Sequence, residues 1–195
     1  KLRAKHKNIV LRMPVLTESY QRILGWFFDF PDEEISLSEL CKKSGVSKTS
    51  ANATIILLEK DGVLKKKIIG KSWLISAAKL NRRFLEKKIS HNISMILQSG
   101  IIEMARERYP NARAIILFGS YRKGDDIPES DIDIAVEVLG KKDIEIKELG
   151  EFSEFGYRKN VKVHAHIFSR KHVDINLFSN IANGIVLQGF LEVRP

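Results

Sequence analysis

The sequence has little cysteine and no long apolar run, and its N-terminal half has few acidic side chains. Cys41 is the only cysteine among 195 residues, so no internal disulfide can form. This composition fits a protein of the reducing cytoplasm. No apolar run exceeds about six residues, far short of the ~20 that cross a bilayer. The sequence therefore predicts a globular protein that does not enter the membrane.

The shortage of acidic residues is confined to one half of the chain. Residues 1–90 contain 19 Lys and Arg but only 9 Asp and Glu, whereas residues 91–195 contain 14 and 15. A basic excess restricted to one segment is typical of a domain that contacts nucleic acid phosphates. We therefore expect two domains, of which the first binds double-stranded DNA.

Residues 17–78 are patterned as three helices followed by a hairpin. Apolar residues recur at helical spacing after Ser19, and a capping box at Ser36 opens a second helix. Ser47 is positioned to cap a third helix. Residues 63–69 and 72–75 lie on either side of Gly70-Lys71, which predicts a two-stranded hairpin.

This order resembles the winged-helix DNA-binding domain, in which the third helix enters the major groove and the hairpin, or wing, runs beside the backbone. The resemblance implies that Asn52 reads adenine and that the wing lysines contact phosphates. The full set of expected DNA-binding residues is Ser47, Lys48, Thr49, Ser50, Asn52, Lys65, Lys66, Lys67 and Lys71. The alternative is that these lysines form a solvated face and the fold serves as a protein-interaction module.

Residues 114–138 have the features of a metal–phosphate site. An apolar run at 114–118 predicts a buried strand, and Gly119 and Ser120 interrupt it. A second strand follows, whose polar face begins with Asp131 and Asp133. Two residues apart on one strand, these carboxylates would lie about 7 Å apart and could share divalent cations that also bind phosphate. The alternative is an ordinary turn followed by an edge strand whose acidic face aids solubility.

The segments Gly119-Ser120, Lys123-Gly124 and Ser130-Asp131-Ile132-Asp133 resemble the signature of the minimal nucleotidyltransferases of the DNA polymerase beta superfamily, the group that contains kanamycin nucleotidyltransferase. The resemblance covers residues 93–191. It implies a mixed sheet flanked by helices, in the α/β (α+β) class, and transfer of a nucleoside monophosphate to a hydroxyl with release of pyrophosphate. The residues it assigns to the nucleotide, ATP first among NTPs, are Gly119, Ser120, Lys123, Gly124 and Ser130. It assigns Asp131 and Asp133 to Mg²⁺, with Mn²⁺ as the alternative.

These two resemblances divide the chain into a winged-helix domain at 1–80, a linker helix at 81–98 and a nucleotidyltransferase-like domain at 99–195. Within the last, we expect a helix at 144–155 and a strand at 160–168. A closing helix at 171–191 completes the expected fold. An exposed part of the linker helix is a candidate homodimer contact.

One part of the family's site is missing from the sequence. The resemblance places a third catalytic carboxylate on the strand at 160–168, but its polar face offers Lys162, His164 and His166. Imidazole is a poor ligand for Mg²⁺, although it can act as a general base or bind Mn²⁺. We therefore take His164 and His166 as candidate catalytic residues. Glu137 lies too far along its strand, and Asp174 reaches the site only if its loop folds back.

Three functional hypotheses follow. In the first, the protein is a transcriptional regulator in which NTP–Mg²⁺ binding to a weakly active or inactive nucleotidyltransferase domain biases DNA affinity. In the second, it is an active enzyme that transfers AMP, or another NMP, to a hydroxyl on a protein, RNA or small molecule. The third is an antitoxin-like component that works beside a small helical partner.

Overall fold

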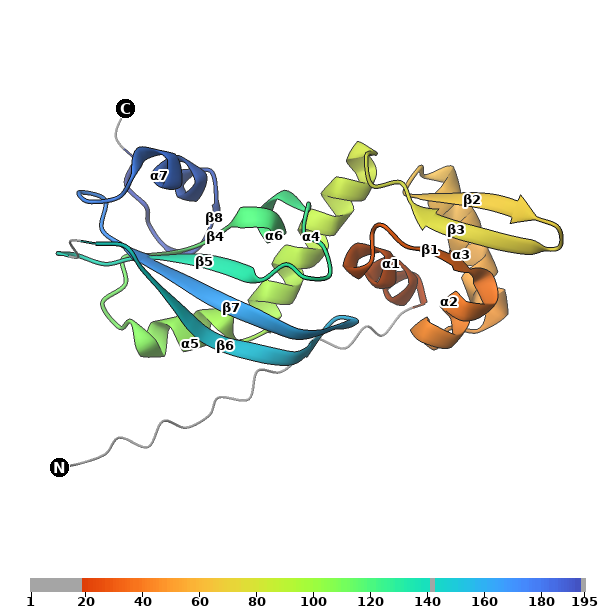
Figure 1. Cartoon of the computed structure of the whole chain (residues 1–195), viewed down its shortest axis with the longest axis horizontal. Helices are drawn as coiled ribbons and strands as arrows, with labels where there is room; N and C mark the ends of the chain where they lie inside the picture. Colours follow the sequence, from red (N-terminus) through yellow and green to blue (C-terminus); the bar gives the residue numbers. More distant parts are fainter. Residues whose placement is uncertain (1–18, 141–142, 194–195) are drawn as a thin grey trace, which may run out of the picture.

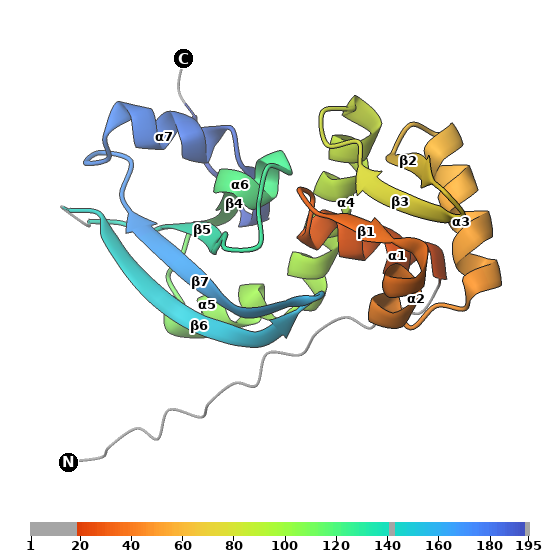
Figure 2. The same ribbon diagram turned by 45° about the vertical axis from the view of Figure 1, so that its right-hand side comes forward.

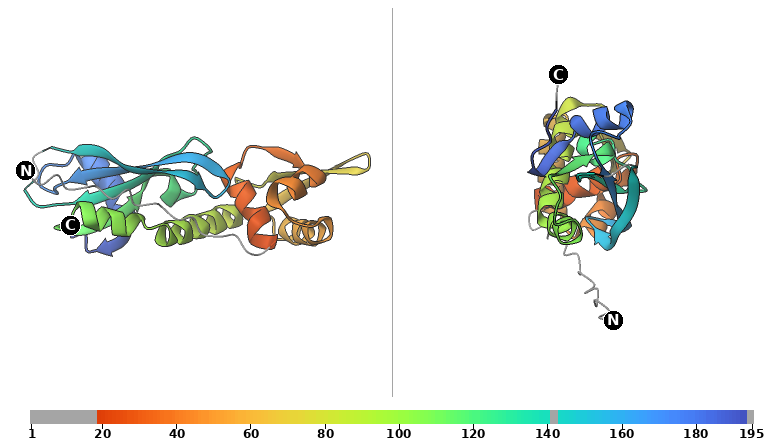
Figure 3. Two further views of the ribbon diagram at one scale, coloured as in Figure 1. Left: turned by 90° about the horizontal axis from the view of Figure 1, so that it is seen from below. Right: turned by 90° about the vertical axis from the view of Figure 1, so that its left-hand side faces the viewer.

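The computed structural model describes residues 19–140 and 143–193, which form two groups of elements at opposite ends of one helix. Figure 1 shows the first group in red to yellow and the second in green to blue, with α4 (Arg82–Gln98) running between them. Figure 3 shows the two groups arranged end to end. The part of the predicted first domain that precedes Ser19 lies outside the described residues.

The first group packs three helices against a three-stranded antiparallel sheet of order β1-β3-β2. Its elements are α1 (Ser19–Asp29), β1 (Glu34–Ser36), α2 (Leu37–Ser44), α3 (Lys48–Lys60), β2 (Leu64–Ile69) and β3 (Ser72–Ala77). The predicted helices and hairpin are present. The third strand, β1, was not predicted, because three residues are too few to show alternation.

Local capping explains where the short helices begin. The Ser36 hydroxyl accepts the backbone N–H of Glu39 at 3.2 Å, and Ser47 accepts that of Ser50 at 3.2 Å. Gly45 ends α2 in the left-handed region, with φ 65°. These caps let α2 and α3 follow one another closely and bury one face each in a core around Phe27.

The helix predicted as a linker at 81–98 belongs to both groups. Phe84 packs in the core of the first group, and Ile96 packs in the core of the second. Between them, Lys88 and Asn92 are also buried. Gly100, with φ 84°, separates α4 from the next helix, just after the predicted end of the linker helix. The helix therefore forms part of the structure of each group rather than a free connection.

The second group is a five-stranded mixed sheet of order β6-β7-β5-β4-β8, in which only β5 and β7 are parallel. Helices α4 and α5 pack against one core and α7 against the other. The elements are α5 (Ile101–Arg108), β4 (Ala114–Phe118), α6 (Gly119–Lys123), β5 (Ile132–Glu137), β6 (Glu145–Phe155), β7 (Arg158–Phe168), α7 (Ile175–Ala182) and β8 (Ile185–Gly189). This arrangement confirms the predicted α/β class and the strand at 160–168.

The prediction of a helix at 144–155 is wrong, because this segment forms the edge strand β6. A bulge between Glu148 and Gly150 shifts the register of β6 on β7. The buried residues of β6 are consequently Leu149, Phe152 and Phe155, three apart. That spacing imitates the periodicity of a helix.

The prediction of a single closing helix at 171–191 is also wrong, because this segment forms the helix α7 followed by the strand β8. Gly184 lies between them, where an added Cβ would come within 2.5 Å of Ile116 and 2.6 Å of the Leu117 carbonyl. The chain turns at this close approach and β8 pairs with β4. None of the helices in residues 19–140 and 143–193 has the length and apolar character that a membrane span requires.

Candidate functional site

The turn after β4 places a glycine against an aspartate. Gly119 has φ 73°, in the left-handed region, and a Cβ added there would lie 2.9 Å from Oδ2 of Asp133. The short helix α6 follows at once and ends at Gly124, whose N–H donates to the Ser120 carbonyl at 2.8 Å. The backbone at Gly119 can approach the carboxylate this closely because it has no side chain.

The two aspartates predicted to bind metal lie at the start of β5, opposite the two predicted histidines of β7. Asp133 is in register with His164 in the parallel pair. His166 Nε2 lies 3.0 Å from Asp133 Oδ1, and His164 Nδ1 lies 3.6 Å from Asp131 Oδ2. Two carboxylates and two imidazoles therefore share one face of the sheet, and all four side chains are partly exposed.

His166 is held in place from two sides. Its ring meets the edge of Phe118, the last residue of β4, with ring centroids 4.9 Å apart. Its Nε2 faces Asp133, while its Nδ1 is buried without a hydrogen-bond partner among the described residues. A neutral ring that carries its proton on Nε2 would donate it to Oδ1, which leaves Oδ2 beside Gly119 as an acceptor.

The loop from α6 to β5 is shaped by its own hydrogen bonds. The Ser130 hydroxyl accepts the N–H of Ile127 at 3.0 Å, so this predicted nucleotide-binding residue stabilises the loop. Lys123 is the last residue of α6 and its side chain is exposed. Gly124, also predicted to contact the nucleotide, lies close to α4, where an added Cβ would come within 2.9 Å of Ile89.

The described residues contain no group of three or more His, Cys, Asp or Glu side chains placed to hold a metal ion together. Glu137 is buried and pairs with Arg170 at 2.5 Å. Asp174 caps α7 by accepting the N–H of Asn176 at 2.9 Å. Both acids that the sequence analysis considered are thus engaged elsewhere.

Sequence reasoning missed one acid on the sheet. Glu148 of β6 lies directly opposite His164 and 3.6 Å from Lys162. Two strand spacings separate it from Asp133, about 10 Å across the sheet. It was overlooked because the periodicity of its segment predicts a helix.

Residues 99–183 match the family model of the nucleotidyltransferase domain. The chain contains a nucleotidyltransferase domain. The matched range includes Gly119, Ser120 and both aspartates, together with the two histidines opposite them. No curated protein matches the chain.

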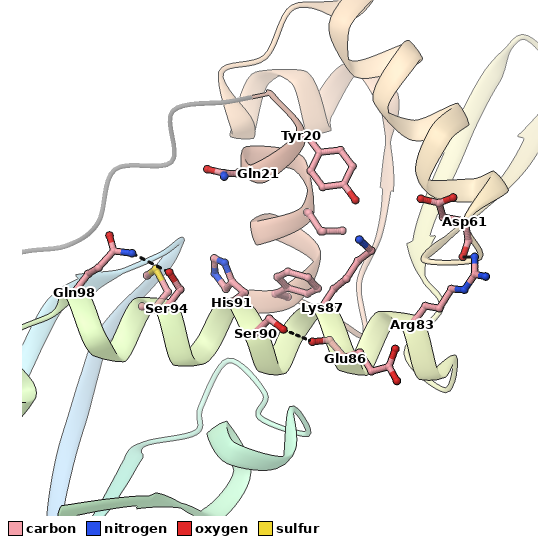
Figure 4. Close-up of a pocket in the computed structure, with 13 residues that line it drawn as sticks. Tyr20, Gln21, Asp61, Arg83, Glu86, Lys87, Ser90, His91, Ser94 and Gln98 are labelled. Carbon is pink, nitrogen blue, oxygen red and sulfur yellow. Dashed lines mark hydrogen bonds between the residues drawn. The ribbon is translucent and has the colours of Figure 1, made fainter. Parts of the chain in front are cut away.

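A hollow of about 760 Å³ lies outside this nucleotidyltransferase domain's predicted site, between α1 and α4. Figure 4 shows Tyr20 and Gln21 on one wall, with Lys87, His91 and Gln98 along α4. None of the residues predicted for the nucleotide or for DNA lines it.

The N-terminal group presents only part of the predicted DNA-binding set. Lys48 and Thr49 are exposed on α3, whereas Ser50 and Asn52 are half-buried. The side-chain oxygen of Asn52 is buried without a partner among the described residues. Asn52 lies with Trp73 along a hollow of about 320 Å³ between α2, α3 and β3. Its amide would have to turn outward before it could contact a base.

The four wing lysines also differ from one another. Lys66 pairs with Glu59 at 2.7 Å and its ammonium lies 4.5 Å from the centre of the Trp73 ring. Lys67 pairs with Glu34 at 3.1 Å. Within the described part of the chain, Lys65 and Lys71 are exposed and have no acidic partner. These two are therefore the wing cations that remain available to a phosphate.

Proposed function

We propose that the protein is a DNA-binding regulator whose nucleotidyltransferase domain binds an NTP together with a divalent cation. The observation that supports nucleotide binding is the close approach of Gly119 to Asp133, with Asp131 immediately before the strand β5 that contains Asp133. Because Gly119 has no side chain, the backbone of this turn can approach a phosphate next to the two carboxylates. ATP is the first NTP to test.

The donor set fits a hard divalent cation. Asp131 and Asp133 supply carboxylate oxygens, which Mg²⁺ prefers, and nucleotide phosphates and water complete its coordination. When bound, the cation would neutralise the charge of the triphosphate. Mn²⁺ is the alternative, since His164 and His166 stand next to the carboxylates and imidazole suits transition metals better.

Binding without efficient transfer is the activity that this site supports best. Transfer needs a base that takes the proton of the acceptor hydroxyl. His166 is committed to Asp133 and packed against Phe118, and the described residues contain no group of three or more His, Cys, Asp or Glu side chains placed to hold a metal ion.

The regulator role rests on the N-terminal group. Its element order, in which α2 and α3 precede the β2–β3 hairpin, supports a winged-helix domain. The exposed Lys48 of α3 and Lys65 and Lys71 of the wing support DNA as the partner. A homodimer through α4 is a further proposal, and Leu97 is an exposed apolar residue on that helix.

Titration calorimetry with a non-hydrolysable ATP analogue and Mg²⁺ tests the nucleotide proposal. Asp133→Asn should weaken binding at least about tenfold, because it removes one of the two negative charges that hold the cation. Asp125→Asn is the matched control, since Asp125 is an exposed acid in the neighbouring loop. Equal affinities for the two variants would contradict the assignment of Asp133.

An active nucleotidyltransferase is the second candidate. It is favoured by the Asp131–His164 and Asp133–His166 pairs, in which a histidine could take up the acceptor's proton. Radiolabel from α-labelled ATP should then appear on an acceptor and be abolished in Asp131→Ala and in His164→Ala. Absence of label with any added protein, RNA or duplex, despite ATP binding, would leave the regulator as the function.

A further inference from the structure

A cluster of four buried charged residues joins the N-terminal group to the loop beside the candidate nucleotide site. It consists of Asp29 at the end of α1, Lys88 of α4, Asp126 of the α6–β5 loop and Arg158 at the start of β7. None of the four is more than 4% exposed. Neither predicted site includes any of these residues.

On the N-terminal side, the cluster attaches α1 to the turn between β6 and β7. Asp29 Oδ2 accepts the N–H of Tyr157 at 2.6 Å, and Asp29 Oδ1 lies 3.2 Å from Arg158 Nε. The Tyr157 hydroxyl donates to the Arg22 carbonyl at 3.1 Å, about two helical turns before Asp29. Figure 2 shows the end of the β6–β7 hairpin beside α1.

The turn is built for this contact. Gly156 has φ 68°, and a Cβ on it would collide with Asp29 Oδ2. Any side chain at this position would push the carboxylate out of the turn. Glycine therefore serves both the shape of the turn and the approach of α1.

On the other side, the cluster fixes the loop that runs from the phosphate turn to the aspartates. Arg158 Nη2 lies 3.3 Å from Asp126 Oδ2, and Nη1 donates to the Ile127 carbonyl at 2.9 Å. Lys88 Nζ lies 3.2 Å from Asp126 Oδ2, and Asn92 donates to Asp126 Oδ1 at 2.7 Å. This loop begins at Gly124, after α6, and ends at Asp131, so nucleotide-site residues flank it.

The charges make the arrangement sensitive to any displacement of the loop. The two carboxylates and two cationic side chains neutralise each other while they are buried away from water. A displacement of any one of them would leave another charge buried without its partner. Burial raises the pKa of Asp29 to about 6, even with Arg158 beside it. The cluster therefore favours one arrangement of its ion pairs over a continuous range of arrangements.

We infer that the cluster of Asp29, Lys88, Asp126 and Arg158 couples nucleotide binding at the nucleotidyltransferase domain to DNA binding by the N-terminal group. This inference rests on the proposed function. A bound nucleotide and cation would restrain the Gly119 turn and α6 before the 124–131 loop and Asp131 at its end, and Asp126 and Ile127 of this loop hold Arg158. Arg158 in turn holds Asp29 and the orientation of α1, against which α3 packs. The coupling must be reciprocal, because binding free energies form a closed cycle.

The test is a binding cycle on the full chain with two probes, AMP-PNP plus Mg²⁺ and a fluorescent 30-base-pair duplex of mixed sequence. In the unmodified protein, saturating AMP-PNP should change the dissociation constant of the duplex by about fivefold or more. Saturating duplex should change that of AMP-PNP by the same factor. Amide hydrogen exchange at Tyr157, which donates to Asp29, should slow when AMP-PNP and Mg²⁺ are added without DNA.

Two variants locate the coupling in the cluster. Asp29→Asn removes the charge that faces Arg158, and Tyr157→Phe removes only the bond to the Arg22 carbonyl, so it serves if Asp29→Asn fails to fold. Each should bring the coupling factor close to one, within about twofold, and leave the separate affinities nearly unchanged. Asp32→Asn, an exposed acid just beyond α1, should keep the full factor.

The outcomes separate the inference from the proposed function. If both probes bind but neither affects the other, the coupling is overturned and the proposed function stands. If both variants keep the full factor, the assignment to this cluster is overturned. If either probe fails to bind the unmodified protein, the proposed function fails and the inference fails with it.

Discussion

Gly119 and Asp133 illustrate how a single missing side chain can define a site. The family resemblance assigned Gly119 to the nucleotide, and the structure adds that its missing side chain lets the turn approach the Asp133 carboxylate. The paired aspartates were predictable because residues two apart on a strand share a face. The alternation of β7 predicted that His164 and His166 share its polar face. The pairing of Asp133 with His166 could not be predicted, because it depends on the register of β5 on β7.

Gly119→Ala should weaken binding of AMP-PNP with Mg²⁺ at least about tenfold, because a Cβ displaces Asp133 and fills the phosphate approach. It should also cost about 1 kcal/mol of unfolding free energy through its positive φ. Gly140→Ala is the control, since its φ is 74° but nothing lies within 4 Å of its added Cβ. Calorimetry and urea unfolding separate the two effects, and equally weakened binding in both variants would contradict the role given to the Gly119–Asp133 approach.

The buried cluster also predicts an unusual dependence of stability on pH. Burial raises the pKa of Asp29 to about 6 from 3.8, so between about pH 4 and 6 the folded state holds a proton that the unfolded chain has released. Stability from this group falls as pH rises. Burial lowers the pKa of His91 to about 4 from 6.5, so between those values only the unfolded chain is protonated. Stability from His91 therefore rises with pH.

The two slopes have opposite signs and should offset each other in the unmodified protein between about pH 4 and 6. In Asp29→Asn, stability should rise with pH up to about 6.5. In His91→Gln, it should fall from about pH 4 to 6. Urea unfolding midpoints across this range measure both slopes, and parallel curves for the two variants would refute the assignment.

At the scale of elements, the sequence predicted whatever depends on local chemistry. The caps at Ser36 and Ser47 and the end of the linker helix at residue 98 are all present. The failures are β6 and the α7–β8 segment, where tertiary pairing decided the structure. The bulge in β6 disguised its alternation, and Gly184 turns the chain only because it meets β4. Lys88 on the apolar side of α4, four residues after Phe84, was the available hint of a buried charge.

The wing offers a prediction about DNA. Neutralising Lys65 and Lys71 to Gln should reduce the slope of log affinity against log salt by about 1 for each phosphate that the wing no longer neutralises. Neutralising Lys66 and Lys67 should change this slope less, because both lysines already form ion pairs with glutamates. A fluorescence titration with the same duplex at several salt concentrations measures the slopes. A larger change for the second pair would mean that the wing binds in another way.

At the scale of the molecule, α4 and the charged cluster both contact the two groups of elements. Trp26 and Trp73, the two tryptophans, both lie in the first group, so their fluorescence follows that group alone. Circular dichroism follows both groups. We expect the two signals to unfold together in urea.

Arg158→Ala should separate these transitions and cost about 3 kcal/mol, because it leaves two acids buried without the guanidinium. Arg106→Ala, an exposed arginine of α5, should leave the signals coincident. Coincident transitions in Arg158→Ala, with unchanged stability, would show that the cluster does not hold the groups together.

The central claim is that Asp131 and Asp133, beside the Gly119 turn, hold a nucleotide through a divalent cation. A crystal structure of the chain grown with Mg²⁺ and AMP-PNP tests it most directly. The account predicts a cation about 2.1 Å from a carboxylate oxygen of Asp131 or Asp133, bridged to phosphates that lie against Gly119 and Ser120. A nucleotide bound elsewhere, or these aspartates still paired only with His164 and His166 at saturating nucleotide, would contradict it.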